Sequence, residues 1–498
     1  MKLLAALFLS CGLLQSATAL NTTSTEPTVQ VLPKNFKPPQ VFQNNNLVRI
    51  INLEKSYARE SVNVVIQNVD KKPQSEYYVS FPTDTISKVG GLEGWQKDSA
   101  DKKKFRVTST QAIPSSSHQY YIVHLHEPLE PSSKLTLTLS YHLQSALTPV
   151  PAAVEQDGKQ YLSFTFPQFV SSAYTTRKQK TTVKFRGTDI PDYTKTSTLK
   201  SEEDPKREGS TFTYGPYDME VKPGSSAPIT VRYEYTRPIV TCTRLERDIE
   251  ISHWGGNLAT EDRFWFRNDA AKLTKQFSRV DWTKKQFHNA PSVALNLIRV
   301  PLAPGSVDPY FIDDIGNVST SRFLPSTETR PGLLDLRPRY PIFGDWKYSF
   351  KIGWNNPLSS VLRRQKSGSG ESYVLKVPFI DGPKMPEGVQ YQEIEIRVIL
   401  PEGAENVKYE ITDGMGIPNN IRSEISLFKT FLDTKGRTVL KLSASKGGDE
   451  AKDGNLIVTY DYPFFALFRK PLSIFGAMLA VFTAVWVLGN IDVSIKKR

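Results

Sequence analysis

The chain has 498 residues, of which 39% are hydrophobic and 23% charged, and its formal net charge is +12. This length is enough for two or three domains with hydrophobic cores. The 63 Lys and Arg residues are dispersed along the chain and predict a solvated surface, with a face for lipid headgroups or acidic partners as the alternative. With only two cysteines, the sequence excludes a fold held together by several disulfides.

The N-terminus has the parts of a secretory signal peptide. Lys2 precedes an apolar stretch, Leu3 to Leu14, and the small residues Ala17 and Ala19 follow it. We therefore expect residues 1–19 to be removed by signal peptidase. The alternative, an uncleaved N-terminal anchor, is less favoured because the apolar stretch is short for a membrane span.

Removal of the signal peptide also removes Cys11 and leaves Cys242 as the single cysteine. No intrachain disulfide is then possible, and we expect Cys242 to be a small buried apolar side chain. A secreted chain without disulfides is more typical of the endoplasmic reticulum than of the cell surface, and a lumenal protein does not meet nucleic acid.

Residues 20–45 are predicted to be a loosely ordered lead-in, because their first part is rich in Pro, Thr and Asn. Asn21 begins an N-glycosylation sequon within this segment. It lies beside the expected cleavage site, and we expect it to escape modification.

Short segments of alternating apolar and polar residues dominate the chain as far as residue 463. In Leu135–Tyr141 the apolar residues occupy every second position, so one face is buried and the other is wet. The same pattern recurs in Ile229–Tyr235 and Ile394–Leu400. It predicts a mainly antiparallel, all-β architecture.

Turns and helices are sparse by comparison. Pairs such as Gly90-Gly91 are interpreted as turns that separate strands. Leu358–Gln365 is expected to form one short helix.

The order of the strands repeats along the chain. Three pairs of similar segments follow in the same order: Lys134–Tyr141 with Lys347–Trp354, Tyr161–Pro167 with Tyr373–Pro378, and Val231–Tyr235 with Val458–Tyr462. Such a repeat is the signature of an internal duplication. We therefore predict two tandem antiparallel β-sandwich-like domains, residues 46–238 and 239–463, joined rigidly without a flexible linker.

No catalytic, cofactor or metal site is predicted. His124 and His126 would share one face of a strand, but no further ligands lie near them in the sequence, so structural histidines are favoured over a zinc site. Asp313 and Asp314 form an acidic pair that could in principle serve a glycosidase, yet such pairs are common in turns. A second sequon begins at Asn317, in a polar turn, and we expect this asparagine to be glycosylated.

The C-terminus carries an apolar run without charge, residues 471–491, which is predicted to be a transmembrane helix. With a cleaved signal peptide, this gives a type I protein whose bulk is lumenal and whose tail, residues 492–498, is cytosolic. Small residues recur every fourth position of the span at Gly476, Ala480 and Ala484. This stripe predicts a packing face for another membrane helix.

Several longer motifs occur together in a fixed order. They are Tyr235–Ile239, Ile251–Leu258, Asp314–Ser321, Arg337–Lys347 and Leu400–Ala404. Together they resemble the ribophorin I family, whose members are subunits of the endoplasmic reticulum oligosaccharyltransferase. The resemblance runs from about Leu47 through the membrane span and is strongest in the second half of the chain.

The resemblance implies a non-catalytic, single-span subunit of that complex, which moves a preassembled oligosaccharide from dolichyl pyrophosphate to Asn of Asn-x-Ser/Thr sequons. Catalysis belongs to a separate polytopic subunit, and no cofactor is expected here. The expected partners are the catalytic and small membrane subunits and nascent glycoproteins, with the translocon as a further candidate. Animal members carry a long cytosolic tail, so the short tail here favours a fungal-type complex without tail-mediated ribosome contact.

Two other functions are compatible with the sequence. The same architecture suits a free-standing lumenal cargo receptor or chaperone of the endoplasmic reticulum. A membrane-anchored hydrolase would need His124 or His126 for activity.

Overall fold

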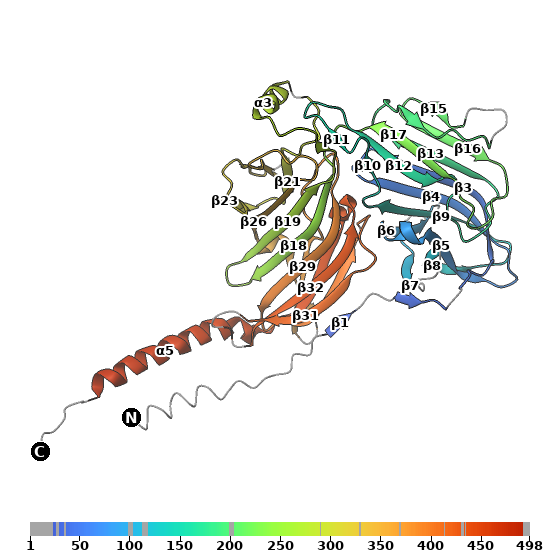
Figure 1. Cartoon of the computed structure of the whole chain (residues 1–498). Helices are drawn as coiled ribbons and strands as arrows, with labels where there is room; N and C mark the ends of the chain where they lie inside the picture. Colours follow the sequence, from blue (N-terminus) through green and yellow to red (C-terminus); the bar gives the residue numbers. More distant parts are fainter. Residues whose placement is uncertain are drawn as a thin grey trace, which may run out of the picture.

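The structure is a computed structural model that describes residues 23–25, 29–33, 36–97, 103–111, 118–198, 204–288, 290–327, 330–367, 370–412, 414–429, 433 and 435–491. The expected signal peptide, the sequon at Asn21 and the tail over residues 492–498 lie outside these ranges. The architecture is mainly β, with one long apolar helix at the C-terminus (Figure 1).

The strands up to β17 (Pro228–Glu234) form what we call the first half, and the elements from β18 (Val240–Ser252) onward form the second half. Each half contains one large sheet. The first sheet has seven strands in the order β15 (Lys206–Glu208), β16 (Thr211–Tyr217), β13 (Gln179–Phe185), β3 (Phe42–Leu53), β4 (Ala58–Asn68), β9 (Lys134–Leu143) and β6 (Val89–Gln96). The second has nine, in the order β1 (Thr23–Thr25), β31 (Arg422–Phe428), β32 (Arg437–Gly447), β29 (Gln390–Glu402), β18 (Val240–Ser252), β19 (Asn257–Asn268), β26 (Lys347–Pro357), β22 (Val307–Asp313) and β23 (Gly316–Asn317).

Smaller sheets accompany each large sheet. In the first half they are β10 (Thr148–Pro149), β12 (Tyr161–Pro167), β17 (Pro228–Glu234) and β14 (Asp192–Tyr193), and β2 (Val29–Val31), β7 (Arg106–Gln111), β8 (His118–Leu129) and β5 (Gln74–Pro82). In the second half they are β27 (Leu362–Ser367), β28 (Gly370–Pro378), β33 (Asn455–Asp461) and β30 (Glu405–Thr412), and β21 (Ile298–Leu302), β25 (Gly332–Leu336) and β24 (Arg322–Leu324). A parallel pair, β11 (Ala153–Val154) with β20 (Lys272–Leu273), joins the halves.

The two halves repeat one strand order. The run β16-β13-β3-β4-β9-β6 has its counterpart in β32-β29-β18-β19-β26-β22, and in each run the second and third strands, β13 with β3 or β29 with β18, are parallel. The smaller sheets correspond in the same way, with β12-β17 matching β28-β33 and β7-β8-β5 matching β24-β25-β21. The three repeated segments of the sequence occupy equivalent strands, so the duplication extends to the topology.

Alternation along the strands builds two hydrophobic cores. In β4 every second residue is buried, as its sequence predicts. The second core runs from Val240 to Ala466. The first core starts at Phe42 and also takes in side chains from beyond residue 238, including Trp282 and Phe343. The boundary at residue 238, which falls between β17 and β18, stays a prediction.

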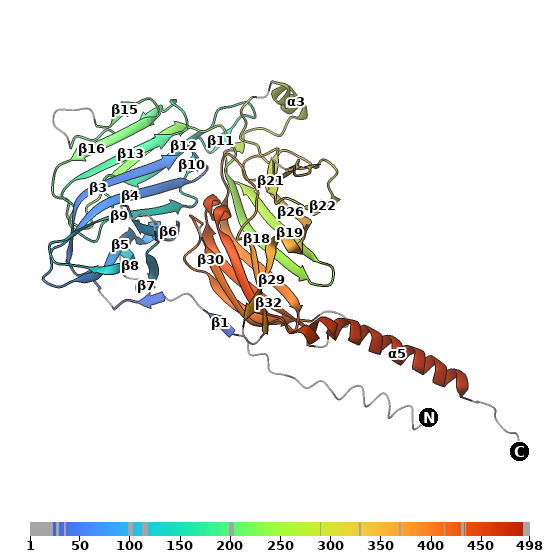
Figure 2. The same cartoon turned by 180° about the vertical axis from the view of Figure 1, so that it is seen from behind.

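Among the described residues, the helices are α2 (Thr83–Ile86), α3 (Arg279–Phe287), α4 (Leu358–Val361) and α5 (Arg469–Asn490), with 3₁₀ turns η1 (Asp449–Asp453) and η2 (Phe464–Phe468). In both views α5 leaves the lower end of the second half, whereas α3 lies at the opposite, upper end (Figures 1 and 2). The helix α5 begins at Arg469, two residues before the predicted start of the span, and ends at Asn490.

The structure corrects three local expectations. The lead-in is not wholly irregular: β1 adds to the edge strand β31, β2 pairs with β7, and β3 starts at Phe42, because short segments can satisfy their backbone groups on open sheet edges. The helix expected over Leu358–Gln365 stops after Val361, since the residues that follow pair with β28. Gly90 and Gly91 lie within β6 and form no turn between strands.

Candidate interaction sites

The two halves meet at a polar interface centred on Glu450, in η1. Its carboxylate accepts hydrogen bonds from the Tyr57 hydroxyl (2.7 Å) and the Lys55 ammonium (3.0 Å), and Arg59 lies 3.3 Å away. Burial raises the pKa of Glu450, but the Lys55 charge, the Tyr57 hydrogen bond and the Arg59 charge outweigh it and lower the pKa to about 2. A carboxylate that stays ionised therefore clamps the loop between β3 and β4 to the second half.

Side chains of each half also form hydrogen bonds with backbone groups of the other half. The Gln144 side chain donates to the carbonyl oxygens of Tyr391 (2.9 Å) and Gly447 (2.8 Å). The Asn419 amide exchanges two hydrogen bonds with the backbone of Leu92, at 2.7 and 2.8 Å. Since buried backbone groups need partners, separating the halves would leave these groups unsatisfied.

The closeness of the two backbones explains the glycines in β6. A Cβ at Gly90 would clash with the Lys446 carbonyl oxygen and with the His142 ring. Gly91 has φ +56° and packs against Gly416, which has φ +71°. His142 is buried beside this contact, and burial lowers its pKa to about 4, so the ring is neutral at physiological pH.

A third element crosses between the halves. The segment after β20 leads to α3, which Ser278 caps by accepting a hydrogen bond from the Asp281 backbone N–H (3.3 Å). Trp282 of α3 is buried against Phe343 (ring centroids 5.5 Å apart), and both belong to the first core. This helix is absent from the elements expected from the sequence, although Ser278 followed by Asp281 is a recognisable start signal.

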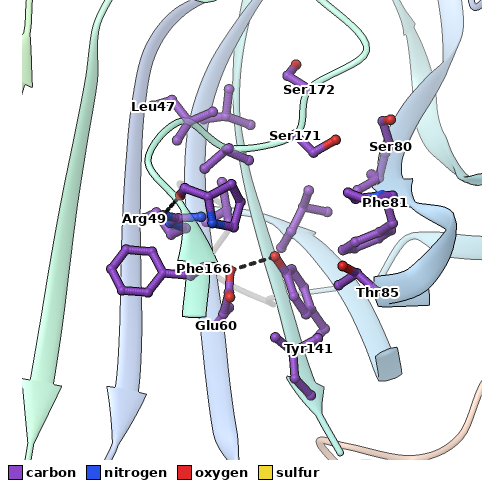
Figure 3. A pocket seen from close by; sticks show the side chains of 18 of the residues that line it. Leu47, Arg49, Glu60, Ser80, Phe81, Thr85, Tyr141, Phe166, Ser171 and Ser172 are labelled. Carbon is purple, nitrogen blue, oxygen red and sulfur yellow. Dashed lines mark hydrogen bonds between the residues drawn. The ribbon is translucent and has the colours of Figure 1, made fainter. Parts of the chain in front are cut away.

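A cavity of about 90 Å³ lies inside the first half, between β3, β4 and β9 on one side and β5 on the other (Figure 3). Two charged residues line it, Arg49 and Glu60, with only 1% and 3% of their surfaces exposed. Arg49 donates to the Pro167 carbonyl (2.6 Å), and its guanidinium lies 5.2 Å from the centre of the Phe166 ring.

Glu60 accepts a 2.8 Å hydrogen bond from the Tyr141 hydroxyl, whose pKa is raised by burial and then by the Glu60 charge. The phenol therefore stays protonated and keeps donating. Because both charges bordering the cavity are engaged by its wall, we assign it a structural role in the first core.

Asn317 is exposed and lies in β23, which forms a hairpin with β22. The turn is held by Asp313, whose carboxylate accepts hydrogen bonds from the backbone N–H groups of Ile315 (3.0 Å) and Gly316 (3.1 Å) and from Arg339 (2.6 Å). Burial raises the pKa of Asp313, but these bonds outweigh it and lower the pKa. Asp313 is thus a turn residue, and glycosylation of the accessible Asn317 stays a prediction.

The remaining candidates for chemistry have separate structural partners. His124 lies 2.9 Å from the Thr108 hydroxyl and 3.7 Å from Glu76, whereas His126 is exposed and packs on Phe105. Over the ranges that the structure describes, no three His, Cys, Asp or Glu residues are grouped as metal ligands. Cys242 is fully buried in the second core, as predicted, and burial raises the pKa of its thiol.

The start of α5 is tied to the second half, where Lys470 lies 3.0 Å from Asp433, and the apolar stretch that follows is largely exposed. The whole apolar window of the candidate span is unburied, and Gly476, Ala480 and Ala484 are exposed. Apart from the flanking residues and the backbone of the helix itself, no atom of the described residues lies within 4 Å of a Cβ built at Gly476. An apolar helix of this length fits a lipid environment.

The sequence profile of Ribophorin I matches residues 42–489, nearly the whole described chain. The chain belongs to the ribophorin I family. The match takes in both halves of this ribophorin I family member, the hairpin that carries Asn317, and almost all of α5.

Curated relatives of this ribophorin I family member are named as subunit 1 or subunit 1B of one glycosyltransferase. It is 29% identical over 450 residues to dolichyl-diphosphooligosaccharide–protein glycosyltransferase subunit 1 of Schizosaccharomyces pombe, covering 90% of this chain and 95% of that protein. The subunit 1 of Caenorhabditis elegans is 28% identical over 455 residues, covering 90% of this chain and 72% of that protein. Among solved structures, yeast LTA4 hydrolase in complex with bestatin aligns with 45% of this chain and 29% of that one, at 9% identity and a TM-score of 0.26, which is too low to indicate a shared fold.

Proposed function

We propose that this chain is an accessory, non-catalytic subunit of the oligosaccharyltransferase complex in the endoplasmic reticulum membrane. In this role it supports transfer of a preassembled oligosaccharide from dolichyl pyrophosphate to Asn of Asn-x-Ser/Thr sequons in nascent polypeptides. The observation that carries the proposal is the match to the ribophorin I family over residues 42–489, together with relatives named as subunit 1 of the glycosyltransferase.

The proposed organisation is a type I protein with two tandem sandwich-like lumenal domains, residues 46–238 and 239–463, on one membrane helix. The repeated strand order of the two halves supports a pair of related domains. The clamp at Glu450 and the packing of Trp282 into the first core support a rigid pair. A rigid body on one span is suited to holding neighbouring subunits in place.

The non-catalytic role is supported by what the polar groups of the chain do. Asp313 holds a turn, Glu450 holds the interface, and His124 and His126 have unrelated partners. Catalysis of glycosyl transfer needs groups that converge on a reacting atom. The candidate groups named here make separate structural contacts instead.

The membrane contact of this subunit is proposed to run along Gly476, Ala480 and Ala484. Small side chains allow another helix to approach closely, and in lipid such packing drives association. The proposed partners are the catalytic and small membrane subunits, while the β body meets nascent glycoproteins and, as a further candidate, the translocon.

Native electrophoresis and mass spectrometry of partners after digitonin extraction test this function. An accessory subunit migrates in a large complex that contains the catalytic subunit. A solitary chain would favour the alternative, a free-standing lumenal cargo receptor or chaperone.

A further inference from the structure

An exposed aromatic cluster surrounds the point where the second half meets α5. Phe464, Phe465 and Phe468 come from the turn η2, and Trp254 comes from the loop between β18 and β19. Phe465 is 82% exposed and Trp254 is 65% exposed. Large exposed aromatic side chains that gather at one place mark an interaction surface, because water solvates them poorly.

The cluster is built as one rigid unit. The indole N–H of Trp254 donates a 2.7 Å hydrogen bond to the Leu467 carbonyl, which joins the hairpin loop to η2. The neighbouring His253 stacks on Tyr462 (ring centroids 4.7 Å apart) and lies 2.8 Å from the Tyr460 hydroxyl, which fixes the loop on β33. These contacts hold the Trp254 indole nitrogen and the loop in place, while the aromatic rings remain exposed.

The position of the cluster at the N-terminal end of α5 indicates that it lies in the headgroup layer of a bilayer. The helix has 22 residues, so it is about 33 Å long at ~1.5 Å per residue, close to the ~30 Å thickness of a bilayer core. The hydrocarbon boundary then falls near Lys470. The five residues of η2 extend up to about 10 Å beyond the helix at ~2 Å per residue. This reach covers the headgroup layer, which is about 5–8 Å thick on each side of the core.

The chemistry of the surroundings agrees with this depth. A pocket of about 680 Å³ opens between α5 and the body of the second half. Its α5 side is apolar, with Ile474 and Phe475, and its other side is polar, with Glu250 and Arg437. Aromatic side chains with basic residues such as Lys470 beside them are typical of the layer between hydrocarbon and water.

We propose that Trp254, Phe464, Phe465 and Phe468 form a membrane-interface anchor, which lies among the phospholipid headgroups at the N-terminal end of α5. The anchor gives the β body a second attachment to the bilayer beside the helix itself. A single helix allows the body to swing, whereas a helix and an adjacent rigid patch fix its angle and height. The proposal requires only that α5 spans a bilayer, and it does not depend on the subunit assignment.

Fluorescence quenching by spin-labelled lipid tests this anchor on the full-length chain in phosphatidylcholine nanodiscs. Bimane is attached to Phe465→Cys, Trp254→Cys or the control Phe287→Cys, while the buried Cys242 does not react. Phe287 is a matched control because it is 87% exposed and lies on α3, at the far end of the molecule. Phosphatidylcholine with a headgroup nitroxide is expected to quench the labels at 465 and 254 at least threefold more than the label at 287. Equal quenching at all three positions overturns the proposal.

A second measurement separates lipid from a protein partner in the native complex. A photoreactive benzoylphenylalanine replaces Phe465 in cells, and the adducts are resolved by mass. The anchor predicts no adduct with another protein at this position. A discrete protein adduct would assign the aromatic cluster to a subunit contact and overturn the proposal, independently of whether the complex itself is found.

Discussion

The hydroxyl of Tyr57 donates a 2.7 Å hydrogen bond to Glu450 across nearly four hundred residues of sequence, and this contact closes the interface between the two halves. Lys55 and Arg59 supply the positive charges that keep Glu450 ionised although it is largely buried. The interface is thus an electrostatic clamp placed on a polar contact surface, and its parts can be tested one at a time.

Replacing Glu450 by Gln is expected to destabilise the folded chain by about 3 kcal/mol at neutral pH. The native pKa of about 2 lies well below the ordinary 4.5, and each pKa unit corresponds to ~1.4 kcal/mol. Urea unfolding of the full-length chain in detergent measures the change. Glu208→Gln is the control, because its pair with Lys206 is exposed and is expected to change stability little. Equal effects of the two substitutions would contradict the clamp.

Acidification from pH 7 to pH 5 is expected to weaken the fold through His142. Its pKa is about 4 in the folded chain and about 6.5 when unfolded, so the unfolded chain binds more protons in this window and stability falls as the pH falls. The loss reaches about 2 kcal/mol at pH 5. His253, whose pKa burial also lowers, adds to it in the same direction.

The urea midpoint at each pH measures this dependence. His142→Gln is expected to reduce the difference between pH 7 and pH 5, while the same change at the exposed His126 leaves it intact. Glu450 contributes little in this window, since its contribution is lost only as the pH falls from about 4.5 toward 2. An unchanged pH dependence in His142→Gln would show that another group is responsible.

A side chain at Gly90 is expected to separate the halves. In Gly90→Ala the new Cβ meets the Lys446 carbonyl and the His142 ring, so the backbones must move apart at a cost of about 1–3 kcal/mol. Faster limited proteolysis near residue 238 and a larger radius in small-angle scattering report the opening. Gly187→Ala is the control, because its Cβ has open space around it.

Asn317→Gln is expected to lower the mass of the mature chain by one N-glycan, visible as a gel shift that endoglycosidase abolishes. The reason is the exposure of Asn317 on its hairpin. Asn21→Gln is expected to leave the mass of the mature chain unchanged. A shift in Asn21→Gln alone would reverse both expectations.

Ala480→Leu is expected to reduce co-purification of the other membrane subunits several-fold, since a larger side chain blocks close helix packing. Phe482→Leu changes the roughly opposite face of the helix, at ~100° per residue, and serves as the control. Unchanged yields with Ala480→Leu would move the contact away from the stripe at Gly476, Ala480 and Ala484.

Most of the fold could be predicted from local patterns in the sequence. The alternation in β29 and the three repeated segments could be recognised from neighbouring residues alone, because burial of one strand face has a period of two. In β9 the expected wet face is wrong: Thr138 and Ser140 are only 5% and 6% exposed, so both faces of this strand are covered. The membrane span could also be predicted from local sequence, because an uncharged apolar run of this length is enough to indicate it.

Contacts between distant segments could not be predicted from the sequence. Gly90 and Gly91 have the local chemistry of a turn, and only their approach to Lys446 and Gly416 shows why no side chain fits there. The pairing of β1 with β31 depends on a free sheet edge some four hundred residues later. Glu450 stands in an ordinary polar stretch, so nothing in its neighbours predicts its role. Such positions are set by the docking of the halves, which has no local period.

The most direct test of the account is glycan occupancy of sequons in cells depleted of this chain. The account predicts that occupancy falls on depletion, that the wild-type chain restores it, and that a chain carrying His124→Ala and His126→Ala restores it equally well. Undisturbed occupancy after complete depletion would contradict a supporting role in N-glycosylation, and failure of the double variant, if it folds and joins the complex, would contradict the non-catalytic role.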